Sequence, residues 1–446
     1  VGSSVCGRHS GVTTHRASVS GHSSHVTGHG VGCEDTAIDR VATIIRTGVG
    51  VVTYPWRSSA AGRQIACDFV AGGNREHVER NGSVGAGVVG VTTAYYLSQL
   101  GCDVTVVDRA SEPGDGATFG NAGQLSYSFT DALAKPAFLA HLPAMILGRD
   151  QGSKVRLSPE LVPWGFRFLA QCTTARAQQN TLAVLELAMR SAELMDELQE
   201  KLPFDFAHRN AGKLVLLSSN KEVAAAKASS ALKQSYGCDA RVLSREEAIA
   251  IEPAIADMSE EVIAAVYSAS DEVADSQRFA AGLTEWLIAQ GAADFRLSSE
   301  ARSLVTHKGR VQGVVVDGED LEADAVVVCL GAWAQAFLGP AGINPHIVPV
   351  RGYSITLPPG PSAPDVSVTA LRYKMVYSRL NGATRVAGFA DFTGFDTGAD
   401  DERIGLLSQV AQRFAPQAAD YDSPDAAAWG GYRPMTPDGR PLVGAT

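Results

Sequence analysis

The sequence lacks the cysteine patterns of metal sites and disulfide frameworks. Its seven cysteines are scattered, and no two of them form a Cys-x-x-Cys pair. We therefore predict no metal site, no disulfide framework and a reducing, cytoplasmic setting. The motifs Gly-x-Ser-x-Gly and His-Glu-x-x-His are also absent, which leaves serine-nucleophile and zinc-assisted mechanisms without support.

Long hydrophobic runs and an excess of basic residues are absent too. No run of about 18 apolar residues occurs, so no membrane-spanning helix is predicted. The formal net charge of −10 argues against a nucleic-acid partner. Phe138–Leu147 is apolar but short, and we predict a buried helix or loop there rather than a membrane-surface patch. The start of the sequence shows neither an initiator methionine nor a signal-peptide pattern.

Residues 1–77 differ in composition from the rest of the chain. They hold six of the ten histidines but no lysine, and loop-favouring Ser-Gly and Gly-Gly pairs recur. Three interpretations compete. The stretch is a disordered histidine-rich tail that could bind metal, or a small domain with strands at Val41–Ile45 and Gly50–Tyr54, or it is not the protein's natural start. We favour the third.

A dinucleotide-binding pattern begins directly afterwards. Gly85-Ala-Gly-Val-Val-Gly90 fits Gly-x-Gly-x-x-Gly, helix-forming residues follow, and Gly101 suits the helix C-cap. Val104–Val107 has the composition of a buried strand, and Asp108 ends it, 18 residues after Gly90. That spacing is close to the one expected for the acidic residue that binds a ribose hydroxyl. The order of these parts predicts a nucleotide-binding domain rather than a glycine-rich turn without a ligand.

The strand that should precede the glycine-rich turn is poor in apolar residues. Arg75-Glu-His-Val-Glu-Arg-Asn-Gly-Ser83 is mostly polar, and only Val84 suits a buried parallel strand. We therefore expect that the native first strand has been replaced in this chain.

The segment after Asp108 points to a flavin rather than a nicotinamide. Arg109–Gln124 is rich in Gly and small polar residues where a simple nicotinamide domain would begin its next helix. With Arg351-Gly-Tyr-Ser and Gly431-Tyr-Arg-Pro-Met-Thr-Pro-Asp-Gly439, it resembles the FAD-dependent D-amino acid dehydrogenases of the D-amino acid oxidase and glycine oxidase superfamily. The resemblance runs from about Gly85 to the last residue.

The resemblance implies an α/β fold in which a Rossmann-type FAD-binding domain is interleaved with an antiparallel-sheet substrate domain. The expected divisions are an atypical segment 1–80, a first FAD segment 81–127, a helical region with the first part of the substrate domain 128–262, a second FAD segment 263–340, the second part of the substrate domain 341–429, and a truncated final FAD segment 430–446. The expected FAD contacts are Gly85, Gly87, Val88, Val89, Gly90, Asp108, Arg109, Thr118, Asn121, Ala122, Gly123 and Gly331.

Hydrophobic periodicity supports this scheme. It predicts helices at Thr181–Leu202 and within Val273–Gln290, where apolar residues recur at helical spacing. Apolar runs predict strands at Lys213–Ser218, Val314–Val316, Ala325–Leu330, Val348–Leu357 and Thr384–Gly388.

The implied chemistry is oxidative deamination of a D-amino acid by hydride transfer from the α-carbon to FAD, with electrons passed to a quinone or another carrier. The cofactor does the hard chemistry, so the protein must hold the carboxylate and aim the Cα–H bond. By resemblance Arg433 holds the carboxylate, which a planar guanidinium does through two parallel hydrogen bonds. Tyr353 is expected to line the pocket and hydrogen-bond the substrate, with Tyr373 and Lys374 as weaker candidates.

Three alternatives stay open. One is an oxidase that uses O2, and another is a nicotinamide-linked dehydrogenase of small acids, which the glycine-rich loop and Arg433 disfavour. The third is a non-catalytic flavoprotein fragment, because the chain stops at Leu442–Thr446 where the family continues for one more strand and helix. The expected partners are a D-amino acid and an electron carrier, with the protein in the cytoplasm or peripheral on the inner membrane.

Overall fold

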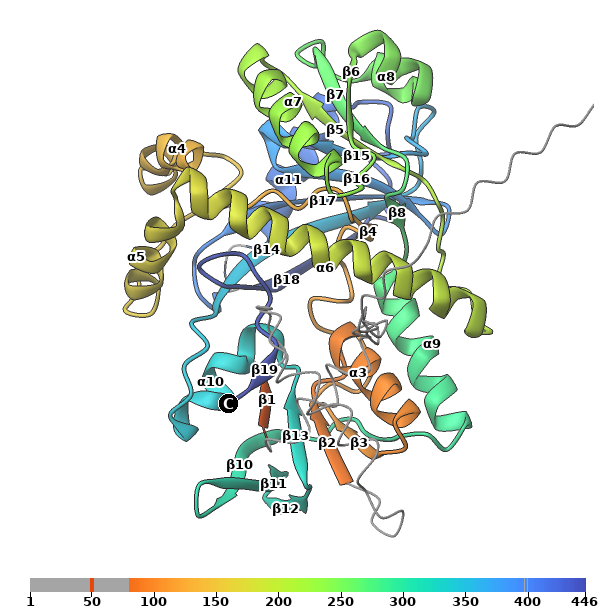
Figure 1. The fold of residues 1–446 in the computed structure, drawn as a ribbon. Coiled ribbons are helices and arrows are strands. Elements are labelled where there is room, and N and C mark those ends of the chain that lie inside the picture. The colour runs from red at the N-terminus through yellow and green to blue at the C-terminus, as the bar shows by residue number, and fades with distance from the viewer. Residues whose placement is uncertain (1–48, 52–79, 397, 399) are drawn as a thin grey trace, which may run out of the picture. The chain divides into compact units, whose positions relative to one another are not determined.

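Two large sheets organise the part of the chain that the structure describes (Figure 1). The computed structural model describes residues 49–51, 80–396, 398 and 400–446. Most of residues 1–77, including the predicted strand Val41–Ile45, therefore lies outside the described residues. Strand β1 (Val49–Val51) overlaps the predicted strand Gly50–Tyr54.

The six-stranded sheet has the order β19-β1-β13-β2-β3-β9. Neighbouring strands in this sheet run parallel to each other, except that β19 pairs antiparallel with β1. The members besides β1 are β2 (Arg80–Val84), β3 (Asp103–Val107), β9 (Asp294–Arg296), β13 (Ala325–Val328) and β19 (Gly444–Ala445).

The expectation that the polar segment before the glycine-rich turn is a poor strand is wrong. Residues Arg80–Val84 form β2 in the middle of the sheet, and all but Arg80 are buried. Gly82 pairs with Val326 on one side and Thr105 on the other. Backbone pairing on both edges does not depend on the side chains, and small residues such as Gly82 and Ser83 fit the buried position.

Each face of this sheet has its own hydrophobic core. Helix α3 (Val88–Gln99) packs on α9 (Ser276–Ala289), and both cover Val104, Val106 and Val327. The other face carries Val326 and Val328 against α10 (Ala334–Leu338) and a three-stranded antiparallel sheet. That small sheet consists of β10 (Ala301–His307), β11 (Arg310–Val316) and β12 (Glu319–Glu322).

The eight-stranded sheet has the order β18-β14-β17-β16-β15-β5-β7-β6 and is antiparallel except for the pair β15–β5. Its strands are β5 (Lys213–Leu217), β6 (Arg241–Ser244), β7 (Ala264–Ser268), β14 (Val348–Leu357), β15 (Ser367–Ala370), β16 (Met375–Leu380), β17 (Ala383–Asp391) and β18 (Ala427–Met435). Helices α8 (Arg245–Ile251) and α11 (Asp400–Phe414) contribute to the core on one face.

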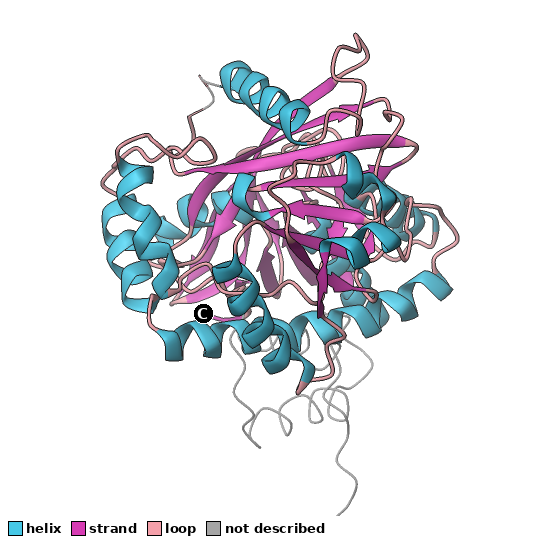
Figure 2. Cartoon of the chain, turned by 90° about the horizontal axis from the view of Figure 1, so that it is seen from above, coloured by secondary structure: helices cyan, strands magenta, loops and turns pink. Residues whose placement is uncertain are grey.

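The remaining elements connect the sheets or flank them, and Figure 2 shows the helices around the strands. They are β4 (Gln124–Leu125) paired with β8 (Glu272–Val273), the helices α4 (Pro136–Ile146), α5 (Leu161–Gln171), α6 (Thr174–Lys201) and α7 (Asn220–Gln234), and the 3-10 turns η1 (Pro253–Asp257), η2 (Gly331–Trp333), η3 (Gly339–Ala341) and η4 (Leu371–Tyr373). Among the described residues, no helix is both long and apolar enough to cross a membrane.

The prediction of a buried segment at Phe138–Leu147 is wrong. The segment forms most of α4, but Met145 is the only buried residue of that helix. Leu139, Ile146 and Leu147 are exposed. Apolar character alone could not decide this, because burial depends on whether another element covers the helix.

The interleaved α/β fold is confirmed, but two of the expected divisions move. Strand β7 was expected to open the second FAD segment, yet it pairs with β5 and β6 of the eight-stranded sheet. The expected division at residue 430 falls inside strand β18, yet this strand pairs with β14 over its whole length. The chain therefore returns to the six-stranded sheet only after these strands, because strand pairing decides which domain a segment joins.

Candidate active site

The turn between β2 and α3 is built around close backbone contacts. Gly85 has a φ of +108°, and a Cβ added there would lie 2.6 Å from the carbonyl oxygen of Cys329. A Cβ added at Gly90 would lie 1.7 Å from the carbonyl oxygen of Gly85. Only glycine fits at both positions, so the helix packs against the turn as dinucleotide binding requires.

The N-terminus of α3 is suited to an anion. Its N-cap is Gly87, which supplies no side-chain cap, and the first turn contains no acidic residue. Thr118 Oγ1 accepts a hydrogen bond from the backbone N–H of Val88 at 3.1 Å, and Val89 is exposed. Aligned N–H groups and the positive end of the helix dipole therefore face outward, as a diphosphate needs.

Asp108 follows β3, beside the same turn. Its Oδ2 accepts from the backbone N–H of Ala86 at 2.6 Å, and its Oδ1 accepts from the N–H of Ala110 at 2.9 Å. The next residue, Arg109, places its guanidinium 4.6 Å from the centre of the Trp333 ring. Trp333 belongs to η2, which begins at Gly331 after β13. Asp108, Arg109 and Gly331 thus lie at the carboxyl ends of the central strands, where ligands bind in such sheets.

The loop that contains Asn121 joins the two sheets. Asn121 Nδ2 donates to Ser276 Oγ at 2.7 Å, and its Oδ1 accepts from the Gly123 N–H at 2.8 Å. The Gly123 carbonyl accepts from the N–H of Ala274 at 2.9 Å. These bonds hold the predicted cofactor loop to the start of α9, and the Asn121 carbonyl accepts from Arg385 of β17 in the eight-stranded sheet at 3.2 Å.

A cavity of about 310 Å³ opens between this loop and the eight-stranded sheet. Five predicted site residues line it together: Asn121, Ala122, Gly123, Tyr353 and Arg433. The other lining residues are Ala117, Gly120, Gln124, Ser126, Phe129, Lys213, Gly352, Ala387, Trp429, Gly431 and Tyr432. Lys213 and Arg433 are the only charged side chains among the lining residues that the structure describes.

Arg433 lies on β18 and lines the cavity. Its Nη1 donates to the Phe389 carbonyl at 2.8 Å, and a Cβ added at Gly352 would lie 2.4 Å from Nη1. The residue is exposed overall, and its guanidinium packs against Gly352 and Phe389 beside the cavity, where desolvation lowers its pKa. The pKa of an arginine is so high that the group stays charged, and Asp391 favours the charged form.

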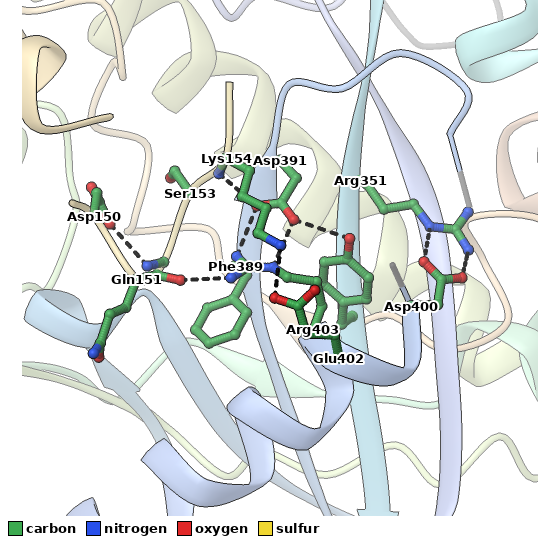
Figure 3. Close-up of polar contacts among 12 residues, drawn as sticks. Asp150, Gln151, Ser153, Lys154, Arg351, Phe389, Asp391, Asp400, Glu402 and Arg403 are labelled. Carbon is green, nitrogen blue, oxygen red and sulfur yellow. Dashed lines mark hydrogen bonds and ion pairs between the residues drawn. The ribbon is translucent and has the colours of Figure 1, made fainter. Parts of the chain in front are cut away.

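Figure 3 shows a buried ion pair of Arg403 and Asp391 near Phe389, the residue whose carbonyl binds Arg433. Arg403 donates to both carboxylate oxygens of Asp391 at 2.8 Å, and both side chains are almost completely buried. Tyr353 donates its hydroxyl to Asp391 at 3.0 Å, and burial followed by Asp391 raises the pKa of that hydroxyl. The predicted hydrogen bond from Tyr353 to substrate would therefore have to use the hydroxyl oxygen as acceptor.

Arg351 belongs to the same strand as Tyr353 and forms an ion pair with Asp400. Its guanidinium binds the carboxylate of Asp400 at the start of α11, with Nε 3.2 Å from Oδ1. It also covers the ring of Tyr432 at 4.3 Å. Arg351 thus fixes Tyr432 at the cavity wall.

The two weaker candidates are not brought to the cavity. Tyr373 donates to Glu261 at 2.7 Å, and Lys374 donates to Asp150 and Ser153, each at 2.7 Å. Neither lines the cavity. Both residues lie in or directly after η4, away from the cavity lining.

Lys213 is the charged residue among the cavity-lining residues that sequence reasoning missed. It begins β5, is 3% exposed, and donates from Nζ to Gln124 Oε1 at 3.0 Å and to Ser126 Oγ at 2.6 Å. In the sequence it is a single lysine at the edge of an apolar strand, a position normally exposed. No local pattern could have indicated its burial.

The described residues fit FAD. The Gly85–Gly90 turn leaves room for a backbone to approach a diphosphate, and Asp108 stands where ribose hydroxyls are bound. The cavity continues from the Asn121 loop to Arg433. Bound there, the flavin would supply hydride acceptance, which no side chain in the cavity provides.

Comparison with known proteins agrees with this geometry. The family model for FAD dependent oxidoreductases matches residues 84–446. D-amino acid dehydrogenase 2 of Ralstonia nicotianae is 40% identical over 376 residues, which cover 81% of this chain and 88% of that protein. D-amino acid dehydrogenase of Vibrio vulnificus is 32% identical and covers 81% and 87%.

Solved structures share the fold at lower identity. L-proline dehydrogenase from P. horikoshii has a TM-score of 0.61 at 20% identity and covers 83% of this chain and 88% of that chain. Glycine oxidase from Geobacillus kaustophilus has a TM-score of 0.59 at 20% identity and covers 82% and 89%. The glycine-rich turn, the Asn121 loop and the family match together identify the chain as a member of the FAD-dependent oxidoreductase family of the D-amino acid oxidase type.

Proposed function

We propose that the chain oxidises D-amino acids at the α-carbon. The substrate would give a hydride to FAD and become an imino acid, which water converts to a keto acid and ammonia. The observation that carries this proposal is Arg433, a guanidinium at the cavity with one N–H bound to the Phe389 carbonyl. Its remaining donors suit a carboxylate in two-point contact. The two relatives named D-amino acid dehydrogenase support the D-configuration.

The cavity composition favours direct hydride transfer. Its lining residues within the described chain include no carboxylate, imidazole or thiol, so no covalent nucleophile of those kinds is at hand. Hydride transfer needs only orientation and a neutral amine. Arg433 would orient the carboxylate, and Tyr353 and Tyr432 would wall the site.

An absorbance spectrum of the purified protein tests the proposal. Oxidised flavin bands that bleach on anaerobic addition of D-alanine, but not of L-alanine, would support it. Bleaching by L-alanine alone would refute the D-configuration. Bands that no D-amino acid bleaches would refute the proposed reaction.

The proposed electron acceptor is a quinone in the membrane rather than O2. A quinone is confined to the bilayer, so the enzyme has to touch that surface. Helices α4 and α5 offer a candidate contact. They pack together through Phe138 and Phe168, whose ring centres lie 4.9 Å apart. Their outer surface exposes the apolar residues Leu139, Ile146, Leu147, Val162, Phe166 and Leu169, hereafter the α4–α5 surface.

The charge around the α4–α5 surface favours an anionic lipid bilayer. Lys135, Arg149 and Arg167 are exposed beside it, with Glu160 as the exposed acidic neighbour. The whole chain, in contrast, has a net charge of −10. Apolar residues edged by basic ones are typical of peripheral membrane contacts. We therefore propose a peripheral position on the cytoplasmic face of the inner membrane.

The identity of the electron acceptor is tested by a separate measurement. With D-alanine in air, stoichiometric peroxide would identify an oxidase and contradict the proposed acceptor. Reduction of a water-soluble quinone analogue without peroxide would support a dehydrogenase.

A further inference from the structure

The cavity contains a lysine that neither the glycine-rich turn nor carboxylate binding requires. Lys213 is 3% exposed and lines the cavity with Arg433. Its Nζ atom lies over the Phe129 ring, 4.4 Å from the ring centre. A lysine is seldom buried unless it is paired, so this position calls for an explanation in terms of chemistry.

Lys213 Nζ has two oxygen acceptors and one aromatic ring around it, a set that a neutral amine can satisfy. A neutral amine has two N–H groups and one lone pair, and Nζ has two acceptors among the described residues, Gln124 Oε1 and Ser126 Oγ. A neutral amine can donate both N–H groups to these oxygens and keep its lone pair, whereas an ammonium has its third N–H beside the Phe129 ring. No carboxylate of the described residues forms an ion pair with Lys213, so the Phe129 ring is the direct contact that favours the protonated form.

The surrounding charges act in opposite directions. Asp271, between β7 and β8, favours the protonated form, but its carboxylate accepts from the N–H and hydroxyl of Ser128. Lys233 of α7 opposes protonation and is itself bound to Asp131. Arg433 adds a second positive charge to the cavity wall. Burial outweighs these charges and lowers the pKa of Lys213 to about 8.

The proposed reaction needs such a group. An amino acid in solution carries an ammonium, which has no lone pair to assist the departure of a hydride from Cα. We propose that Lys213 accepts the proton of the substrate ammonium, with Gln124 and Ser126 holding its Nζ. This inference rests on the proposed function and names a further catalytic residue for it.

The proton transfer balances without another reactant. The lone pair of Lys213 Nζ forms a new N–H bond as one N–H bond of the substrate breaks, and the electrons of that bond stay on the substrate nitrogen. The positive charge moves from substrate to Lys213, so the total charge of the site is unchanged. The two-electron oxidation that follows is the hydride transfer of the proposed function.

Two variants distinguish the role of Lys213 as a proton acceptor from the role of its positive charge. Lys213→Met keeps the approximate length and the apolar part of the side chain. Lys213→Arg keeps a positive charge that is not lost by deprotonation at neutral pH. Lys227→Met, at an exposed position of α7, is the matched control. FAD content and melting temperature measured for each variant report whether it folds.

The readout is the anaerobic rate of flavin reduction by D-alanine as a function of pH. In the wild type the rate rises with pH and levels off near the pKa of Lys213. In Lys213→Met and Lys213→Arg, only substrate that is already neutral in solution reacts. The rate at pH 8 then falls by about 100-fold, in the range typical of losing a general base, and the rising limb moves to higher pH. The pH profile of flavin reduction in Lys227→Met matches that of the wild type.

A second readout does not depend on turnover. NMR titration of the holoprotein labelled at lysine Cε, with the Lys213 signal assigned by its loss in Lys213→Arg, gives the pKa directly. Added ethylamine should restore part of the reduction rate in Lys213→Met, since a free amine can replace the missing one.

The outcomes separate the two proposals. A wild-type flavin reduced by D-alanine, together with unchanged rates and pH profiles in both Lys213 variants, would overturn the proton-acceptor role alone. A Lys213 pKa near that of free lysine would overturn it as well. A wild-type flavin that no D-amino acid reduces would overturn the proposed function and this role with it. A loss restored by ethylamine would support both.

Discussion

At the scale of single residues, Arg433 is the side chain most directly tied to substrate binding. Arg433→Lys keeps the positive charge but loses the planar pair of donors and the contact with Gly352. We expect KM for D-alanine to rise by about 10- to 100-fold, the equivalent of a lost hydrogen bond to a charged group. Steady-state kinetics measure this. Arg379→Lys on β16 is the control, because that arginine pairs with Asp365 at 3.2 Å and does not line the cavity.

Lys213 predicts a pH dependence of stability. Its pKa is about 8 in the folded protein and 10.5 as the ordinary value for the unfolded chain. Between these pH values the unfolded chain binds more protons, so the wild type gains stability as pH rises, by at most about 1.4 kcal/mol per pH unit. Lys213→Met should lack this gain. Urea unfolding at pH 8 and pH 10 gives the comparison, and an equal pH dependence in both proteins would contradict the lowered pKa.

At the scale of elements, the junction of β2 and α3 tolerates no added atom. In Gly90→Ala the Cβ would lie 1.7 Å from the Gly85 carbonyl oxygen, so the helix must move away from the turn. We expect the purified variant to lose most of its FAD, measured as flavin absorbance per protein. Gly165→Ala is the control, because α5 leaves open space at that position. That change should stabilise its helix by up to about 1 kcal/mol and leave FAD content unchanged.

The ion pair between β17 and α11 predicts a large stability effect. Asp391→Asn would leave the buried guanidinium of Arg403 without its carboxylate. Removing one partner of a buried pair costs about 3–5 kcal/mol, measurable by chemical unfolding. Glu322→Gln breaks the exposed pair with Arg80 and should change the free energy of unfolding by no more than about 1 kcal/mol. Similar small effects for both variants would show that the buried pair is not needed.

Elements also show the limits of sequence patterns. The helix at Thr181–Leu202 and the strands at Val348–Leu357 and Thr384–Gly388 are confirmed within α6, β14 and β17. Each has a long apolar pattern of clear period, which reports the buried face directly. Strand β2 has no such pattern and was predicted wrongly, because its position depends on hydrogen bonds to β13 and β3.

At the scale of the whole molecule, the α4–α5 surface predicts membrane binding. Phe166→Asp combined with Leu147→Asp replaces two residues that are 70% and 64% exposed. We expect the wild type to sediment with vesicles that contain phosphatidylglycerol, and the double variant to remain in the supernatant. Ile288→Asp is the matched control, because that residue is 53% exposed on α9. Equal sedimentation of all three proteins would refute the proposed contact.

Features whose chemistry is local could be predicted from the chain alone. Gly85–Gly90, the helix after it and Asp108 lie within one short stretch, and the Arg433 segment is a single recognisable motif. Only the tertiary structure decided which distant residues share the cavity. Lys213, Gln124 and Arg433 come from segments far apart in the chain, and neither the burial of a lysine nor the exposure of α4 is visible until the sheets and helices pack. Burial is a property of neighbours in space, and it sets both the pKa of Lys213 and the apolar surface of α4 and α5.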